Sequence, residues 1–145
     1  MLYEYRIATE KDIPGIKAIS DVMLKDTGLG VATIPKITNL VTSPNTLFAL
    51  ALQADEIVGF TCAVAHESVF NDRKRVSDIG VFVLPAQRGS EIAAVLVETL
   101  EHWAMHRGIK EIWLGQTTGS NIDKVAEYYQ RLGYTIRGFN ALKEI

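Results

Sequence analysis

The sequence contains a single cysteine, Cys62, among its 145 residues. One thiol cannot form an intramolecular disulfide, and the chain has no cluster of cysteines and histidines with the spacing of a structural zinc site. A reducing compartment therefore fits the composition. Because Cys62 lies in the apolar run 60–65, we expect it to be a small buried residue.

Long apolar runs and an excess of basic residues are absent too. No stretch approaches the ~20 apolar residues that a membrane-spanning helix needs, and the charged, strand-like N-terminus has no signal-peptide core. The net charge of −2 gives no sign of the basic surface that usually binds nucleic acid. We therefore expect a cytoplasmic protein with no membrane partner and no nucleic-acid partner.

What the chain does have is enough apolar character for a core, since 48% of its residues are hydrophobic. Its length fits one domain, which we expect to span residues 1–145. Apolar periodicity predicts helices at 10–25, 31–41 and 122–132, and a long one from 92 to just before Gly108. Thr9 is the expected N-cap of the first helix, paired with Asp12.

Strand signals fill the intervals between these helices. Runs rich in apolar and β-branched residues predict strands at 3–8, 46–52, 56–66, 75–84, 110–114, 134–137 and 141–144. The resulting order is β-α-α-β-β-β-α-β-α-β-β. We therefore expect an α/β fold in which a mixed central sheet carries helices on both faces.

The most informative segment runs from 81 to 93, where a buried strand ends at a proline and an Arg-Gly-Ser loop leads into a helix. Such a loop presents free backbone N–H groups at the positive end of the helix dipole, which favours a phosphate or pyrophosphate. Arg88 adds a fixed positive charge and Ser90 a hydroxyl. A plain strand–helix turn capped by Ser90 fits this loop equally well.

This segment resembles the acetyl-CoA-binding motif of the GCN5-related N-acetyltransferase family, Arg/Gln-x-x-Gly-x-Gly/Ala after a Val-x-Pro strand end. Arg88 matches the first position and Ala93 the last, whereas Glu91 stands where the family usually has glycine. The segments 6–13 and 56–60 resemble the family's first strand–helix unit and hairpin strand. Near the end, Asn121 and the segment 128–134 (Tyr-Tyr-Gln-Arg-Leu-Gly-Tyr) resemble its Asn…Tyr-x-x-x-Gly-Phe/Tyr helix.

The resemblance implies that acetyl-CoA is the cosubstrate and that the enzyme uses no metal. The acceptor would be an amine on a small molecule or a peptide, selected by the segments 21–41 and 67–74, and a homodimer is compatible with the family. The implied donor-binding residues are Val81 and Val83 through their main chain, and Arg88, Gly89, Ser90, Glu91, Ile92, Ala93 and Asn121.

Two catalytic residues follow from the resemblance and the chemistry. Tyr129 is the candidate general acid, because a phenol of pKa ~10 is protonated at neutral pH and can donate to a thiolate. Asp78 is the candidate base, with Glu67 and His66 as alternatives. The alternatives to these roles are a core position for Tyr129, an ion pair of Asp78 with a neighbouring basic residue, and helix capping by Asn121.

Two further functions remain open at this stage. A relative of the family with another donor or a nucleic-acid acceptor would keep the fold and change the chemistry. A catalytically degenerate protein that binds or regulates is favoured by one feature, because the carboxylate of Glu91 could repel a phosphate. His102 and His106 have the i, i+4 spacing of metal ligands, but without a third ligand they are expected to be solvated.

Overall fold

A mixed five-stranded sheet carries the fold in the computed structural model, which describes residues 2–25, 27–116 and 121–145. In spatial order its strands are β1 (Glu4–Ile7), β2 (Thr46–Gln53), β3 (Glu56–Glu67), β4 (Lys74–Val83) and β5 (Ile112–Trp113). The first four strands pair antiparallel, and β5 is parallel to β4. The predicted mixed sheet is therefore confirmed.

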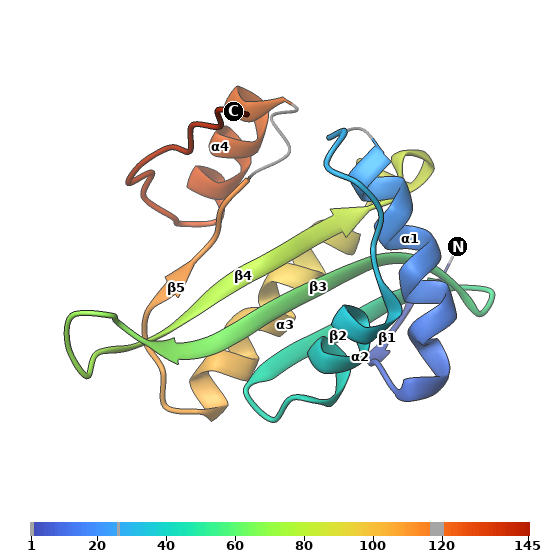
Figure 1. The fold of residues 1–145 in the computed structure, drawn as a ribbon, viewed down its shortest axis with the longest axis horizontal. Coiled ribbons are helices and arrows are strands. Elements are labelled where there is room, and N and C mark those ends of the chain that lie inside the picture. Colours follow the sequence, from blue (N-terminus) through green and yellow to red (C-terminus); the bar gives the residue numbers. More distant parts are fainter. Residues whose placement is uncertain (1, 26, 117–120) are drawn as a thin grey trace. The chain divides into compact units, whose positions relative to one another are not determined.

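Helices cover both faces of this sheet, as predicted. They are α1 (Ile13–Lys25), α2 (Ile34–Thr42), α3 (Ile92–His106) and α4 (Ile122–Arg131), with short 3-10 helices η1 (Glu10–Asp12) and η2 (Pro85–Gln87). Figure 1 shows α1 and α2 over one face and α3 over the other. The chain divides into two compact units, Met1–Gly115 and Gln116–Ile145, and α4 belongs to the second.

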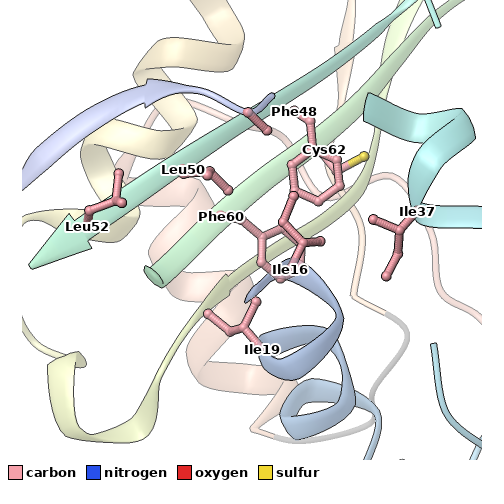
Figure 2. Packing of buried hydrophobic residues seen from close by; sticks show 9 residues of the cluster. Ile16, Ile19, Ile37, Phe48, Leu50, Leu52, Phe60 and Cys62 are labelled. Carbon is pink, nitrogen blue, oxygen red and sulfur yellow. The ribbon is translucent and has the colours of Figure 1, made fainter. Parts of the chain in front are cut away.

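The core under α1 and α2 follows from the helical spacing of their apolar residues. Ile16 and Ile19 of α1 are 0% and 4% exposed, and they pack with Leu50 and Phe60 of the sheet (Figure 2). Cys62 belongs to the same cluster and is 1% exposed, so its predicted burial is confirmed. Burying a large aliphatic side chain of this kind stabilises the fold by ~1.5–3 kcal/mol.

The opposite face of the sheet is buried under α3. Leu96 and Leu100 are both fully buried and belong to two clusters formed with strand residues such as Ala51 and Val76. Because both faces are covered, the middle of β2 is apolar at consecutive positions instead of alternating.

Gly59 lets α3 approach the sheet closely. A Cβ atom built on this glycine would lie 3.0 Å from Ile92 Cγ2 and 3.0 Å from the Phe82 carbonyl oxygen. Ile92 is the first residue of α3 and is fully buried. The start of α3 is therefore held directly against the backbone of β3.

The turn between β2 and β3 has two residues, Ala54 and Asp55, with φ of 49° and 66°. Positive φ at both positions matches the right-handed twist of a two-residue hairpin. The predicted hairpin is thus confirmed.

The predicted last two strands, 134–137 and 141–144, are not present. Residues 134–145 carry no strand, and most of them are exposed, Phe139 to 94% and Leu142 to 73%. Strand patterning alone does not make a strand, because each one needs another backbone to pair with.

Within the described residues, no helix is both long and apolar enough to cross a membrane.

The start of α1 generates a stability prediction. Both guanidinium Nη atoms of Arg6 donate to the Asp12 carboxylate at 2.7 and 2.8 Å, and the Thr9 N–H donates to it at 2.8 Å. These hydrogen bonds, that of Arg6 first, lower the pKa of Asp12 from 3.8 to about 2. The predicted pairing of Thr9 with Asp12 is confirmed.

We expect Asp12→Ala to lower the free energy of unfolding by about 1 kcal/mol at pH 7, because Arg6 is partly exposed and the ion pair is screened. Because the pKa of Asp12 is lower in the folded state than in the unfolded state, its ionised carboxylate stabilises the fold above the unfolded pKa. This stabilisation is lost as the pH falls through the folded pKa. The difference from wild type, measured by urea unfolding, should therefore shrink between pH 4 and pH 2. A difference that does not depend on pH would contradict this account.

Candidate active site

The loop between β4 and α3 builds a concentration of backbone N–H groups. After η2 the chain turns at Gly89, whose φ of 83° suits glycine, and α3 begins three residues later. The N–H groups of Arg88, Ile92 and Val95 donate to acceptors within the protein. Those of residues 89–91, 93 and 94 have no acceptor among the described residues. They lie at the N-terminus of a 15-residue helix, where the dipole favours an anion.

Ser90 stabilises this loop from within. Its hydroxyl donates to the Gln87 carbonyl oxygen at 2.6 Å and accepts the Ile92 N–H at 3.3 Å. The hydroxyl therefore fixes the turn and the first N–H of α3, as the capping alternative expected. The backbone N–H of Ser90 is the part that stays open to a ligand.

Arg88 extends along the end of β4. Its Nε donates to the Val83 carbonyl oxygen at 3.1 Å, and its guanidinium carbon lies 5.6 Å from the centre of the Phe82 ring. The two Nη groups have no acceptor among the described residues, so this exposed cation keeps most of its donors for a phosphate.

The outer edge of β4 is open beside this loop. Among the described residues, pairing with β5 covers only Val76 with Ile112 and Ser77 with Trp113. The Leu84 N–H donates to Val58 of β3 at 2.9 Å. Because backbone groups alternate in direction along a strand, those of Val81 and Val83 point away from β3, toward the edge that β5 leaves uncovered. These are the two residues that the sequence assigned to main-chain binding of the donor.

Asp78 directly follows Ser77, where the pairing of β4 with β5 ends. The β3–β4 register shifts between the pairs Cys62–Gly80 and Ala63–Asp78, which leaves Ile79 as the extra residue of a β-bulge. Asp78 Oδ1 accepts the Gly115 N–H at 2.9 Å. Burial raises the pKa of Asp78 from 3.8 to about 6, and the Gly115 hydrogen bond opposes the rise.

The ion pair considered for Asp78 is not formed among the described residues. Arg75 lies instead 3.4 Å from Glu111, which also accepts the Trp113 indole N–H at 2.7 Å and pairs with Arg73. Glu111 is thus the ion-pair partner of both Arg73, just before β4, and Arg75, within β4.

The two alternative bases are both exposed. His66 Nε2 is 2.8 Å from Ser77 Oγ, and its Nδ1 is 3.1 Å from the Glu67 carbonyl oxygen. His66 is therefore held across the β3–β4 pair, next to the end of the β4–β5 pairing. Glu67, the last residue of β3, has its side chain in solvent.

The remaining predicted residues belong to the second unit. Tyr129 is half-buried on α4, and its ring centre lies 6.4 Å from that of Tyr128 and 6.1 Å from that of Tyr134. Asn121 occupies the N-cap position in a left-handed conformation, φ 51° and ψ 43°, and its side chain makes no capping hydrogen bond. Its capping role is thus limited to the backbone.

Two contacts near the loop were not predicted. The Tyr3 hydroxyl donates to Gln87 Oε1 at 2.8 Å, and burial first, then the charge of the Glu91 carboxylate, raise the pKa of Tyr5 to about 12. The only sequence signal was the i, i+2 spacing of the two tyrosines on a strand, which places both side chains on one face.

An open strand edge beside a helix N-terminus can hold an extended ligand that ends in phosphates. The residues fit acyl-CoA in this respect: the open N–H groups suit the pyrophosphate, and the main chain of Val81 and Val83 can pair with an amide-containing arm. The fold and this arrangement define the acyl-CoA N-acyltransferase class.

Comparison with known proteins identifies the family. The acetyltransferase (GNAT) family profile matches residues 23–134, and the chain belongs to this family. An aminoglycoside acetyltransferase from an uncultured soil metagenomic sample is 17% identical, with a TM-score of 0.80 and coverage of 100% of this chain and 99% of the other. A comparison with curated protein sequences found no significant match.

Two other solved structures show the same fold. A predicted acetyltransferase with acetyl-CoA from Clostridium acetobutylicum is 18% identical, with a TM-score of 0.77 over 98% of this chain and 96% of the other. A transcriptional regulator from Bacillus halodurans is 22% identical, with a TM-score of 0.79 over 99% and 100%.

The half-buried carboxyl group of Asp78 generates a prediction about stability. A raised folded pKa means that ionisation costs more in the folded state, so stability falls as pH rises from 3.8 through about 6. Asp78→Asn keeps an oxygen acceptor for the Gly115 N–H and removes the charge. We expect it to raise the unfolding free energy by about 1–2 kcal/mol at pH 8 and by much less at pH 4. Urea unfolding at the two pH values tests this, and a loss of stability at pH 8 would contradict it.

Proposed function

We propose that this protein transfers an acetyl group from acetyl-CoA to a primary amine by direct attack in a ternary complex. The observation that carries the proposal is the row of open N–H groups at the start of α3, next to the uncovered edge of β4. We further propose that residues 1–145 act as one domain and that the enzyme is cytoplasmic. The likeness in fold to a structure with acetyl-CoA supports the choice of donor.

The donor is held chiefly by the main chain. The open N–H groups of residues 89–91 and 93 receive the pyrophosphate, Arg88 adds its free Nη donors, and the backbone of Val81 and Val83 aligns the arm along β4. The bound donor supplies an activated acyl group as a thioester. Fixing it along a rigid strand lowers the entropic cost of bringing it to the amine.

The acceptor is an amine on a small molecule or a peptide. The structural neighbours include aminoglycoside acetyltransferases, which supports a small-molecule amine. With a pKa of about 6, Asp78 is ionised at neutral pH and can take a proton from the ammonium form of the acceptor, directly or through water. The amine nitrogen then forms the new bond to the acyl carbon.

Tyr129 supplies the proton that the leaving sulfur takes up, and the proton that the attacking nitrogen loses as the amide forms restores the phenol. As the carbon–sulfur bond breaks, the departing sulfur gains negative charge, and a protonated phenol can neutralise it. We assign this role to Tyr129 and a contact with the donor to Asn121.

The donor site is tested by Arg88→Ala, with Arg88→Lys as the control that keeps the charge. Loss of a charge-assisted contact to phosphate should weaken acetyl-CoA binding about tenfold to a hundredfold, or ~1.5–3 kcal/mol, with a smaller loss for the lysine variant. Titration calorimetry measures both, and circular dichroism checks the fold. An unchanged dissociation constant would remove Arg88 from the site.

Wild-type protein that binds neither acetyl-CoA nor coenzyme A at millimolar concentration would refute the enzymatic proposal. That result would favour the non-catalytic alternative. The transcriptional regulator among the structural neighbours makes a binding or regulatory protein the form this alternative would take.

Tyr129→Phe tests the general acid once an acceptor has been found with a panel of amines scored by thiol release. The variant keeps the ring and its contacts with Tyr128 and Tyr134. We expect kcat to fall about 10²–10⁴-fold while acetyl-CoA affinity stays near wild type. Tyr128→Phe on the adjacent position is the matched control and should change kcat little. Equal effects of the two substitutions would return Tyr129 to a packing role.

A further inference from the structure

Gln87 differs from its neighbours in the loop that joins β4 to α3. Of residues 85–91, Gln87 alone is half-buried, and all the others are exposed. The loop is fixed at its two ends, because Val83 of β4 is 8% exposed and Ile92 of α3 is fully buried. Between these ends, Gln87 is therefore the side chain that the loop directs into the protein.

Both ends of the Gln87 side-chain amide are hydrogen-bonded to segments outside the loop. Its Oε1 accepts the Tyr3 hydroxyl at 2.8 Å, and its Nε2 donates to Gln53 Oε1 at 3.0 Å. Tyr3 lies just before β1, and Gln53 is the last residue of β2, next to the hairpin turn. Because a polar group withdrawn from water is costly without a partner, these two bonds hold the amide in one orientation.

The main chain of Gln87 connects this fixed side chain to the rest of the loop. Its N–H donates to the Leu84 carbonyl oxygen at 2.9 Å, and its carbonyl oxygen accepts the Ser90 hydroxyl at 2.6 Å. Ser90 Oγ in turn accepts the Ile92 N–H at 3.3 Å. A continuous series of hydrogen bonds therefore leads from Gln87 to the first residue of α3, across the segment that carries the open N–H groups of residues 89–91.

We infer that Gln87 is a positioning residue for the donor, and that it acts through Ser90 and the open N–H groups that follow it. Tyr3 and Gln53 hold the Gln87 amide, and Gln87 holds the turn that presents these N–H groups. A loop that must first be ordered when a ligand binds loses affinity, whereas a loop that is already fixed does not. The inference rests on the proposed acyl-CoA donor.

Gln87→Met tests this role, because methionine has nearly the length of glutamine but lacks the amide. We expect the dissociation constant of coenzyme A, measured by titration calorimetry, to rise about three- to tenfold, as the loss of neutral hydrogen bonds predicts. The same exchange at Gln130, an exposed residue of α4, is the matched control and should leave the dissociation constant unchanged. An unchanged value in Gln87→Met, with the fold intact by circular dichroism, would overturn the inference.

The two partners of Gln87 supply a test that leaves the loop sequence intact. Tyr3→Phe removes the hydroxyl and keeps the ring on its apolar cluster, and Gln53→Met removes the acceptor. Each should weaken coenzyme A binding about two- to fivefold. In the Gln87→Met background neither should weaken it further, because the interaction is already gone. Losses that persist in that background would show that Tyr3 and Gln53 act by another route, and would overturn the inference.

Steady-state kinetics separate positioning of the donor from a general loss of structure. In Gln87→Met the KM for acetyl-CoA should rise, whereas kcat and the KM for the acceptor stay near wild type, because the loop contacts neither the acceptor nor the acyl group. An equal fall of kcat at saturating acetyl-CoA would assign Gln87 a purely structural role and overturn the inference.

A measurement without any ligand distinguishes failure of this inference from failure of the proposed function. Backbone amide exchange of residues 88–92 should be faster in Gln87→Met and Tyr3→Phe than in wild type and Gln130→Met, with the exchange of β2 and β3 unchanged. If wild type binds no coenzyme A but the loop exchanges as described, the donor assignment fails and the anchoring of the loop by Gln87 stands. If wild type binds coenzyme A and neither affinity nor exchange differs among the variants, the anchoring fails alone.

Discussion

The early parting of β4 from β5 is the constraint on which the candidate site depends. Two strands that paired along their whole length would satisfy each other's backbone groups and leave no edge for a ligand. Here the pairing stops after Ser77 and Trp113, and a β-bulge at Ile79 follows at once on the other side of β4. Among the described residues, the main chain of Val81 and the N–H of Val83 are thereby left without a strand partner, whereas the Val83 carbonyl oxygen accepts Arg88 Nε. Unpaired backbone groups of this kind are costly. The proposed donor would satisfy these groups.

That parting also explains the unusual surroundings of Asp78. It lies at the point where β4 loses one neighbour, so it is partly withdrawn from water. In the part of the chain that the structure describes it gains no cation, and a single N–H, from Gly115, is its partner. A carboxyl group in this position lowers the stability of the folded protein at neutral pH, and its pKa lies nearer neutrality. Functional sites commonly show this exchange of stability for reactivity.

Much of the fold could be predicted from the sequence because the decisive patterns are local. The helical spacing of Ile16 and Ile19, the pairing of Thr9 with Asp12, and the turn at Ala54 and Asp55 each depend on residues a few positions apart. The position of the loop between β4 and α3 could be predicted for the same reason, since strand, glycine and helix follow one another directly. The prediction of the last two strands was wrong, because the apolar pattern of 134–144 says nothing about whether a neighbouring backbone is there to pair with. The partners of Asp78 and Tyr3 were likewise out of reach, since each hydrogen bond joins residues that are far apart in sequence.

Cys62 gives this protein a built-in reporter of opening. It is 1% exposed between α1 and the sheet, and burial, with a smaller contribution from Asp78, raises the pKa of its thiol to about 12. Alkylating reagents act on the thiolate, so the folded protein is inert to them, whereas a chain that opens this cluster reacts as an ordinary thiol. The rate of alkylation therefore times the opening of the core, and a second cysteine placed on the surface can carry a dye without first removing the native one.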